Sequence, residues 1–173
     1  YPMAHMVWAD GGFLAKIGSV DFAGGNVVHI SSGITALTLC ILLGKRYDYK
    51  RANYKIHNMP MVALGAFILL FGWFGFNAGS ALAAHAFVTT AVSSAAAMLS
   101  WMFCDVVVNK KPTFVGACTG MVAGLVGITP GAGFVPIWAA LIIGLTTSPI
   151  CFFMISWVKE KFGYDDALDA FGC

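Results

Sequence analysis

The chain has 173 residues, of which 59% are hydrophobic and only 10% are charged, and its mean hydropathy is +0.81. Because soluble domains carry about 25% charged residues, this composition excludes a soluble globular domain and indicates an integral membrane protein. The net charge of +2 does not indicate nucleic-acid binding, since nine of the ten basic residues lie in three clusters between apolar runs. The five cysteines are scattered singly, without metal-ligand spacing, so we expect no disulfide framework, metal site or cofactor.

Three stretches contain no Lys, Arg, Asp or Glu: Phe22–Gly44, Asn58–Cys104 and Pro112–Val158. The first holds 23 residues, slightly more than the ~20 that a membrane-spanning helix needs. The other two hold 47 residues each, enough for two spans and a tight connection, and all are too long for barrel strands of ~9–11 residues. We therefore predict an all-α polytopic membrane bundle with spans at about 22–44, 58–80, 83–108, 113–128 and 137–158.

The two ends of the chain are expected to belong to further spans. Tyr1–Trp8 resembles the outer end of a preceding span, and Ala167–Cys173 resembles the start of a following one. The chain begins without an initiator Met and stops soon after a new apolar segment starts. We therefore expect residues 1–173 to be a fragment of a single transmembrane domain.

The basic clusters predict the orientation of the spans. They lie at 45–55, 110–111 and 159–161, and the predicted chain crosses the membrane an even number of times between them. All three clusters therefore face one side, which the positive-inside rule names cytoplasmic. We expect a cell-membrane protein whose cytoplasmic loops are 45–57, 109–111 and 159–166, with the turns near 78–85 and 129–136 outside.

Glycines recur at three- or four-residue intervals along the predicted span 113–128, at positions 116, 120, 124 and 127. Small residues on one helix face let backbones approach closely, which bundles in lipid need because lipid supplies no hydrophobic drive between helices. The span 58–80 carries a similar stripe at Gly72, Gly75 and Gly79. These stripes predict close helix packing in a multi-span bundle.

His29 lies inside the first apolar run, where a charged side chain costs roughly 2.5–3.5 kcal/mol on insertion scales. It follows Asp21 by eight residues, or about 12 Å along a helix. Three interpretations stay open: a neutral imidazole hydrogen-bonded within the bundle, a pore or proton-relay group, and a ligand of haem or a metal. Asp21 can accept hydrogen bonds from the free backbone donors of the first helical turn, and it can also attract cations at the outer mouth.

The span 58–80 ends in an aromatic and polar stretch, Phe71–Ser80. Trp73 and Phe76 are three residues apart and Ser80 is four further on, so the three share a helix face. Aromatic stripes more often serve packing, but this one ends in a hydroxyl near the outer surface. That combination fits capture of a small cation by cation–π contact and hydrogen bonding. His85, in the following turn, is expected to face water.

Sequence strings along the whole chain resemble the ammonium transporter family (Amt/Mep/Rh), and its Amt branch more than its Rhesus branch. The matching strings are YPMAHMVW (1–8), DFAGGNVVH (21–29), HNMP (57–60), GWFGFNAGS (72–80), GLVGITP (124–130) and DDALDAFG (165–172). The resemblance implies an eleven-span fold, of which this chain would cover the end of the fourth span, spans five to nine and the start of the tenth. It also implies a homotrimer with one pore in each subunit.

The resemblance assigns roles at the outer mouth. Trp8 and Ser80 match part of the ammonium-recruiting site, and Asp21 matches the acid that holds this site together. Phe76 matches one of two stacked gating phenylalanines.

The resemblance also assigns pore and exit residues. Trp73 matches a pore-lining tryptophan, and Thr129, within its matching string, is grouped with the pore. His29 matches the first of two hydrogen-bonded pore histidines, and the second is expected directly after Cys173. Asp166 and Asp169 match acids near the cytoplasmic exit.

The implied function is facilitated uptake of ammonium, which loses its proton and crosses an apolar pore as ammonia. An ammonium sensor of the same fold is the main alternative, and an appended signalling domain would distinguish it. A haem protein using His29 and His85 is a third reading, and an absorption spectrum without a Soret band would exclude it. We expect no enzyme activity, since no nucleophile elbow or paired acid accompanies the histidines. The expected partners are the lipid bilayer and, at the cytoplasmic loops, a PII-type regulatory protein.

Overall fold

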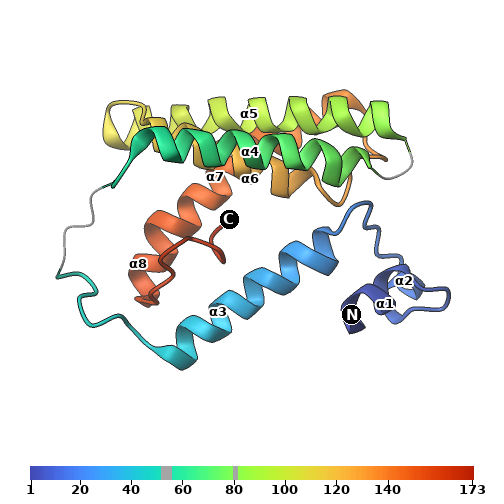
Figure 1. Cartoon of the computed structure of the whole chain (residues 1–173), viewed down its shortest axis with the longest axis horizontal. Coiled ribbons are helices and arrows are strands. Elements are labelled where there is room, and N and C mark those ends of the chain that lie inside the picture. The colour runs from blue at the N-terminus through green and yellow to red at the C-terminus, as the bar shows by residue number, and fades with distance from the viewer. Residues whose placement is uncertain (52–55, 80–81) are drawn as a thin grey trace.

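The computed structural model describes residues 1–51, 56–79 and 82–173, and all elements in these ranges are helical (Figure 1). The all-α prediction is therefore confirmed. The α-helices are α1 (Pro2–Trp8), α2 (Phe13–Lys16), α3 (Ser31–Leu43), α4 (Met59–Ala78), α5 (Ala83–Asn109), α6 (Phe114–Ile128), α7 (Ile137–Phe153) and α8 (Lys159–Phe162). Two segments are π-helical. The first, η1 (Gly25–Ile30), leads into α3, and the second, η2 (Met154–Val158), connects α7 to α8.

Four continuous helical segments are long and apolar enough to cross a membrane: Gly25–Leu43, Met59–Ala78, Ala83–Asn109 and Ile137–Phe162. The apolar helix Phe114–Ile128 is shorter. These five segments lie in the five ranges where we predicted spans. The last continues beyond the predicted end at residue 158 because α8 extends it.

Two helices begin at side chains that cap their first backbone donors. Asn58 accepts a hydrogen bond from the backbone N–H of Met61 at the start of α4. Thr113 accepts one from Gly116 at the start of α6, at 2.9 Å, and its own hydroxyl donates to Asp105 of α5 at 2.6 Å. Such caps satisfy donors that have no partner within the helix, so these short polar residues fix where α4 and α6 begin.

Helix α5 is the centre of the bundle, because it packs along both α6 and α7. Helix α4 lies against α5 and α6, and these four helices run together in Figure 1. Helix α3 lies apart from them in the same view, and the C-terminal segment lies between α3 and the bundle. The arrangement leaves a space between α3, α4 and α6 that the C-terminal segment partly fills.

Small residues and hydroxyls make the contacts between α5 and its neighbours α6 and α7. The glycine stripe on α6 predicted this kind of close packing. Ser93 is fully buried and donates to the carbonyl oxygen of Gly124 at 3.0 Å. Ser148 of α7 is also fully buried and donates to the carbonyl oxygen of Ala97 at 2.5 Å. A Cβ at Gly124 would lie 2.5 Å from the Cβ of Ala97. The helix pair α5–α6 therefore requires glycine at this position.

The stripe on α4 behaves differently. No described atom outside the local helix lies within 4 Å of a Cβ placed at Gly72 or Gly75. A Cβ at Gly79 would meet only the backbone of Gly75, one turn earlier. Within the described parts of the chain, the α4 stripe makes no close helix contact, so close packing along this stripe stays a prediction.

Replacing Gly124 with Ala should destabilise the full-length protein by roughly 1–3 kcal/mol, the usual cost of overpacking a close contact. The added methyl group would overlap both Ala97 and the carbonyl oxygen of Ser93, which lies 2.7 Å from the Cβ position. Gly72→Ala is the matched control, since it makes the same chemical change at a position where no described atom lies within 4 Å of the added Cβ. Thermal unfolding of the purified protein should show a lower midpoint for Gly124→Ala alone, and equal midpoints would contradict the close contact.

Candidate functional site

Asp21 organises the start of the first long helix. Its Oδ1 accepts hydrogen bonds from the backbone N–H groups of Gly24 and Gly25, at 2.8 and 2.7 Å. Its Oδ2 accepts from those of Asn26 and Val27, at 2.8 and 3.2 Å. The predicted cap is therefore present, and it satisfies four donors rather than the one that a single cap commonly takes. The carboxylate is buried and committed to the backbone.

The chain reaches this cap through a glycine pair. Gly24 adopts φ +115°, a conformation that side chains disfavour. A Cβ at Gly25 would lie 2.6 Å from the ring of Pro130, so only glycine allows this approach to the turn after α6. The backbone N–H of Phe22 also donates to the carbonyl oxygen of Pro130 at 2.9 Å. The sequence Asp-Phe-Ala-Gly-Gly thus anchors η1 to the end of α6.

Trp8 lies beside this anchor. Its indole Nε1 donates to the backbone carbonyl oxygen of Asp21 at 2.9 Å, although the side chain as a whole is 51% exposed. The hydrogen bond fixes the ring while leaving its surface open. The structure thus brings two of the residues expected at the outer mouth, Trp8 and Asp21, into direct contact. Ser80, the third, lies outside the described residues.

Thr129 joins three segments of the chain at a single buried hydroxyl. The hydroxyl donates to the carbonyl oxygen of Leu125 at 2.8 Å, and it accepts a hydrogen bond from Trp73 Nε1 at 2.9 Å. His29 Nε2 lies 3.2 Å from the same oxygen. The segments η1, α4 and α6 therefore meet at Thr129, which is fully buried.

The hydrogen bonds of Thr129 favour one tautomer of His29. A threonine hydroxyl has one hydrogen to donate, and here it points to Leu125. When its hydrogen goes to Leu125, Oγ1 of Thr129 acts as an acceptor toward His29, which favours the neutral tautomer with the proton on Nε2. In the neutral ring, Nδ1 then keeps its lone pair and can receive a proton from another group.

Three aromatic rings form a compact cluster around this hydrogen bond. The rings of His29 and Trp73 stack, with centroids 5.3 Å apart and planes 12° apart. The ring of Phe76 lies 5.9 Å from that of His29 and 5.8 Å from that of Trp73. Four residues expected in the pore (His29, Trp73, Phe76 and Thr129) are thus brought together, and His29 also sits in the π-helical turn η1, a distortion often found at functional sites.

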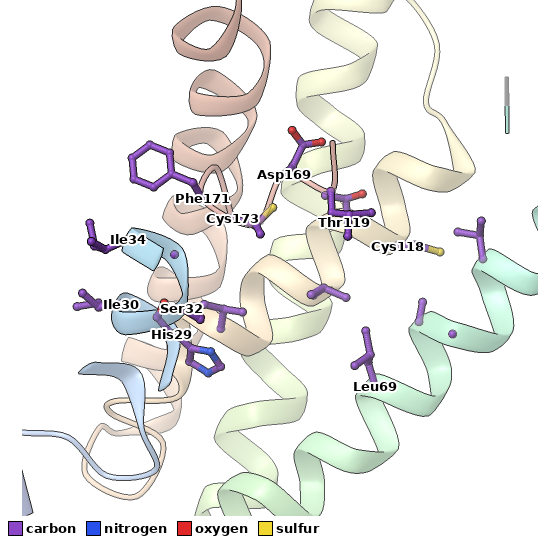
Figure 2. A pocket seen from close by; sticks show the side chains of 18 of the residues that line it. His29, Ile30, Ser32, Ile34, Leu69, Cys118, Thr119, Asp169, Phe171 and Cys173 are labelled. Atoms are coloured by element: carbon purple, nitrogen blue, oxygen red, sulfur yellow. Dashed lines mark hydrogen bonds between the residues drawn. The ribbon is translucent and has the colours of Figure 1, made fainter. Parts of the chain in front are cut away.

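A cavity of about 820 Å³ begins at His29. The cavity is open to the outside, its lining is mostly apolar, and the lining residues come from η1, α3, α4, α6 and the C-terminal segment. Figure 2 labels His29, Cys118, Thr119, Asp169 and Cys173 among the lining residues. His29 and Asp169, one of the two acids expected at the cytoplasmic exit, therefore line the same cavity.

The other exit acid, Asp166, does not line this cavity but shapes the turn beside it. Asp166 is buried, and its carboxylate accepts hydrogen bonds from the backbone N–H groups of Ala170 and Phe171, at 3.1 and 2.9 Å. Asp169 is half-buried and pairs with Lys159, whose Nζ lies 2.6 Å from Oδ1. The two acids therefore have different environments: one caps a turn, and the other forms an ion pair.

Near these two acids, Arg46 and Asp165 form an ion pair that the sequence did not predict. The guanidinium of Arg46 donates to both carboxylate oxygens of Asp165, each at 2.8 Å, and the Arg46 backbone N–H donates at 2.9 Å. These hydrogen bonds hold the pKa of Asp165 below its usual value. The partners are 119 residues apart, so no local pattern could have paired them. The pair ties the end of α3 to the segment after α8.

His85 differs from the expectation that it faces water. The side chain is half-buried, and Nε2 lies 2.7 Å from the carbonyl oxygen of Val135. Because a carbonyl oxygen only accepts, Nε2 must carry the proton of this hydrogen bond. His85 thus links the first turn of α5 to the turn before α7, a structural contact that the sequence could not reveal.

The sequence profile of the Ammonium Transporter Family matches residues 1–173. The ammonium transporter of Bacillus subtilis is 51% identical over 176 residues, covering 99% of this chain and 43% of the relative. That of Aquifex aeolicus is 53% identical, covering 99% of this chain and 41% of the relative. The chain thus spans less than half the length of these relatives.

Solved structures give the same result for the fold. The crystal structure of Saccharomyces cerevisiae Mep2 matches with a TM-score of 0.88 at 42% identity, covering 99% of this chain and 41% of that one. A structure named Sensor Amt Protein matches with a TM-score of 0.90 at 30% identity, covering 98% of this chain and 46% of that one. Together, the family match along the whole chain and the helical fold show that this chain belongs to the ammonium transporter family.

Proposed function

We propose that the complete protein moves ammonium nitrogen across a membrane, through a path that passes the aromatic cluster and the cavity between His29 and Asp169. The observation that carries this proposal is the mostly apolar cavity beginning at a histidine in a family of named ammonium transporters. A charged ion loses much of its hydration in such a cavity, so the cavity disfavours potassium and ammonium alike. Neutral ammonia does not carry this cost.

Recruitment takes place at the outer mouth. Trp8 and Phe76 present exposed ring surfaces on which a small cation can be held, and Ser80 adds a hydroxyl. Asp21 acts indirectly, because its carboxylate is occupied by four backbone donors and its carbonyl oxygen holds Trp8. Asp21 is therefore a positioning residue that builds the mouth rather than a direct ligand of the cation.

Proton handling takes place at His29. The hydrogen bonds of Thr129 favour a proton on Nε2, and Nδ1 is then the nitrogen that can accept a proton. Trp73 holds the ring from its face and shares the Thr129 hydroxyl. A second imidazole supplied by the longer protein next to Nδ1 would complete a relay in which ammonia and its proton separate.

The longer protein is proposed to be a homotrimer in the cell membrane, with residues 1–173 as part of one transmembrane domain. The loops 45–57, 109–111 and 159–166 are then cytoplasmic. These loops carry the basic residues and offer the surface on which a PII-type regulatory protein would bind. Lys55 lies outside the described residues.

An ammonium sensor is the second candidate, and the match to the structure named Sensor Amt Protein favours it. A sensor of this fold would keep the outer recruiting residues, since it must bind the cation. It would not need a continuous path from His29 to Asp169. The cavity joining these two residues is the reason to place transport first.

The decisive experiment uses the full-length protein in proteoliposomes, with protein-free liposomes as the control. We expect an inward ammonium gradient to drive flux, while an equal potassium gradient drives none. Ammonium flux equal to that of the protein-free liposomes would overturn the transport proposal. Saturable ammonium binding without flux would instead identify a sensor.

A further inference from the structure

The ammonium group of Lys159 occupies a small oxygen site at the inner end of the cavity. Its Nζ lies 2.6 Å from the backbone carbonyl oxygen of Asp166 and 2.6 Å from Oδ1 of Asp169. Both side chains of the ion pair are largely covered, with exposed fractions of 22% for Lys159 and 30% for Asp169. A primary ammonium group thus makes N–H···O bonds to a carbonyl and a carboxylate, the interactions that a free ammonium ion would make in the same place.

Asp169 is the member of this pair that touches the transport path. It lines the cavity together with His29 (Figure 2). Lys159 is not among the lining residues and reaches Asp169 from the start of α8. The charge that a departing substrate meets is therefore decided by whether Lys159 pairs with Asp169. An unpaired carboxylate at this place would attract any small monovalent cation.

The turn that carries Asp169 does not depend on Lys159 alone. Asp166 accepts hydrogen bonds from the backbone N–H groups of Ala170 and Phe171, and the backbone N–H of Cys173 donates to the carbonyl oxygen of Asp169 at 2.9 Å. These bonds hold the turn from within. Removing the charge of Lys159 should therefore expose the Asp169 carboxylate without dismantling its surroundings.

We infer that Lys159 is a positioning residue: its ammonium group fills a cation site at Asp169 and keeps this end of the path from retaining ammonium or other small monovalent cations. The inference rests on the proposed transport function, but it makes a separate claim about binding. Without the lysine charge, the protein gains a cation site at its inner end, and release of the substrate becomes slow.

The test compares four forms of the full-length protein: wild type, Lys159→Met, Lys159→Arg and the double variant Lys159→Met/Asp169→Asn. Methionine approximates the length of lysine without its charge, arginine keeps the charge, and the double variant removes both members of the pair. Methylammonium binding is measured by calorimetry on purified protein, and methylammonium uptake is measured in proteoliposomes. The binding measurement detects the added site whether or not the protein transports methylammonium.

We expect Lys159→Met to bind one additional methylammonium per subunit, and both KM and maximal uptake rate to fall at least threefold. Lys159→Arg should match wild type, and the double variant should lose the extra site and recover the uptake rate. A merely structural role would lower the amount of folded protein and would not be repaired by Asp169→Asn.

Two results would overturn the inference: Lys159→Met binding the same number of cations as wild type, or the double variant keeping the added site. Failure of the transport proposal would give a different result, because the wild-type protein would then show no uptake in any assay. The calorimetric comparison of Lys159→Met with the double variant would still decide the role of Lys159.

Discussion

Replacement of His29 with Ala in the full-length protein should lower the preference for ammonium over potassium at least about tenfold, a change of ~1.4 kcal/mol between the two barriers. The imidazole stacks on Trp73, contacts Thr129 and lines the cavity. Its removal leaves room for water there, so a charged ion loses less hydration on entry. It also removes the only nitrogen of the cluster that can accept a proton. Paired measurements of ammonium and potassium flux in proteoliposomes give the ratio directly.

Thr129→Val is the informative companion to this variant. Valine keeps the shape of threonine but removes the oxygen that bonds both His29 and Trp73. The ring of His29 would remain stacked on Trp73, but it would lose the acceptor that favours a proton on Nε2. We expect Thr129→Val to have reduced flux with its selectivity mostly retained.

For His29→Ala, unchanged selectivity would contradict a role for the imidazole in excluding ions.

The helices were predictable because each depends on information that is local in the sequence. Uncharged runs located the four long apolar segments and the shorter helix Phe114–Ile128, and polar clusters or turn residues separated them. The cap formed by Asp21 was also local, since its four donors lie within six residues of it. The three-residue spacing of Trp73 and Phe76 correctly placed the two rings side by side.

The arrangement around the site was not predictable in the same way, because its key contacts join distant parts of the chain. His29 and Thr129 are 100 residues apart, and Trp73 and Thr129 are 56 apart. The close approach of Gly25 to Pro130 is similarly long-range, and so is the pairing of Arg46 with Asp165. Periodicity indicates which face of a helix is apolar, but it does not indicate which hydroxyl a histidine will meet. The shared hydroxyl of Thr129 emerged only from the fold.

Asp21→Ala should destabilise the full-length protein by about 2–4 kcal/mol and abolish measurable uptake, because several backbone donors would lose a charged acceptor. The loss is less than four independent hydrogen bonds would give, since water can enter the space left by the carboxylate. Without the cap, the η1 turn that carries His29 loses its support, and the carbonyl oxygen that holds Trp8 becomes free to move. Thermal unfolding and uptake should therefore fall together.

The Asp21→Asn variant separates the effect of losing hydrogen-bond acceptors from the effect of losing side-chain volume. Asparagine has nearly the shape of aspartate, but it offers one acceptor oxygen where aspartate offers two. If its oxygen faces Gly24 and Gly25, its amide N–H₂ must face the N–H groups of Asn26 and Val27, which are donors as well. The opposed donors exclude water from the gap and repel each other, so Asn should be as harmful as Ala despite its better fit. A near-normal Asp21→Asn protein would mean that two hydrogen bonds suffice and that the mouth does not depend on a carboxylate. The comparison thus decides whether Asp21 works through its charge and paired oxygens or merely through the volume it fills.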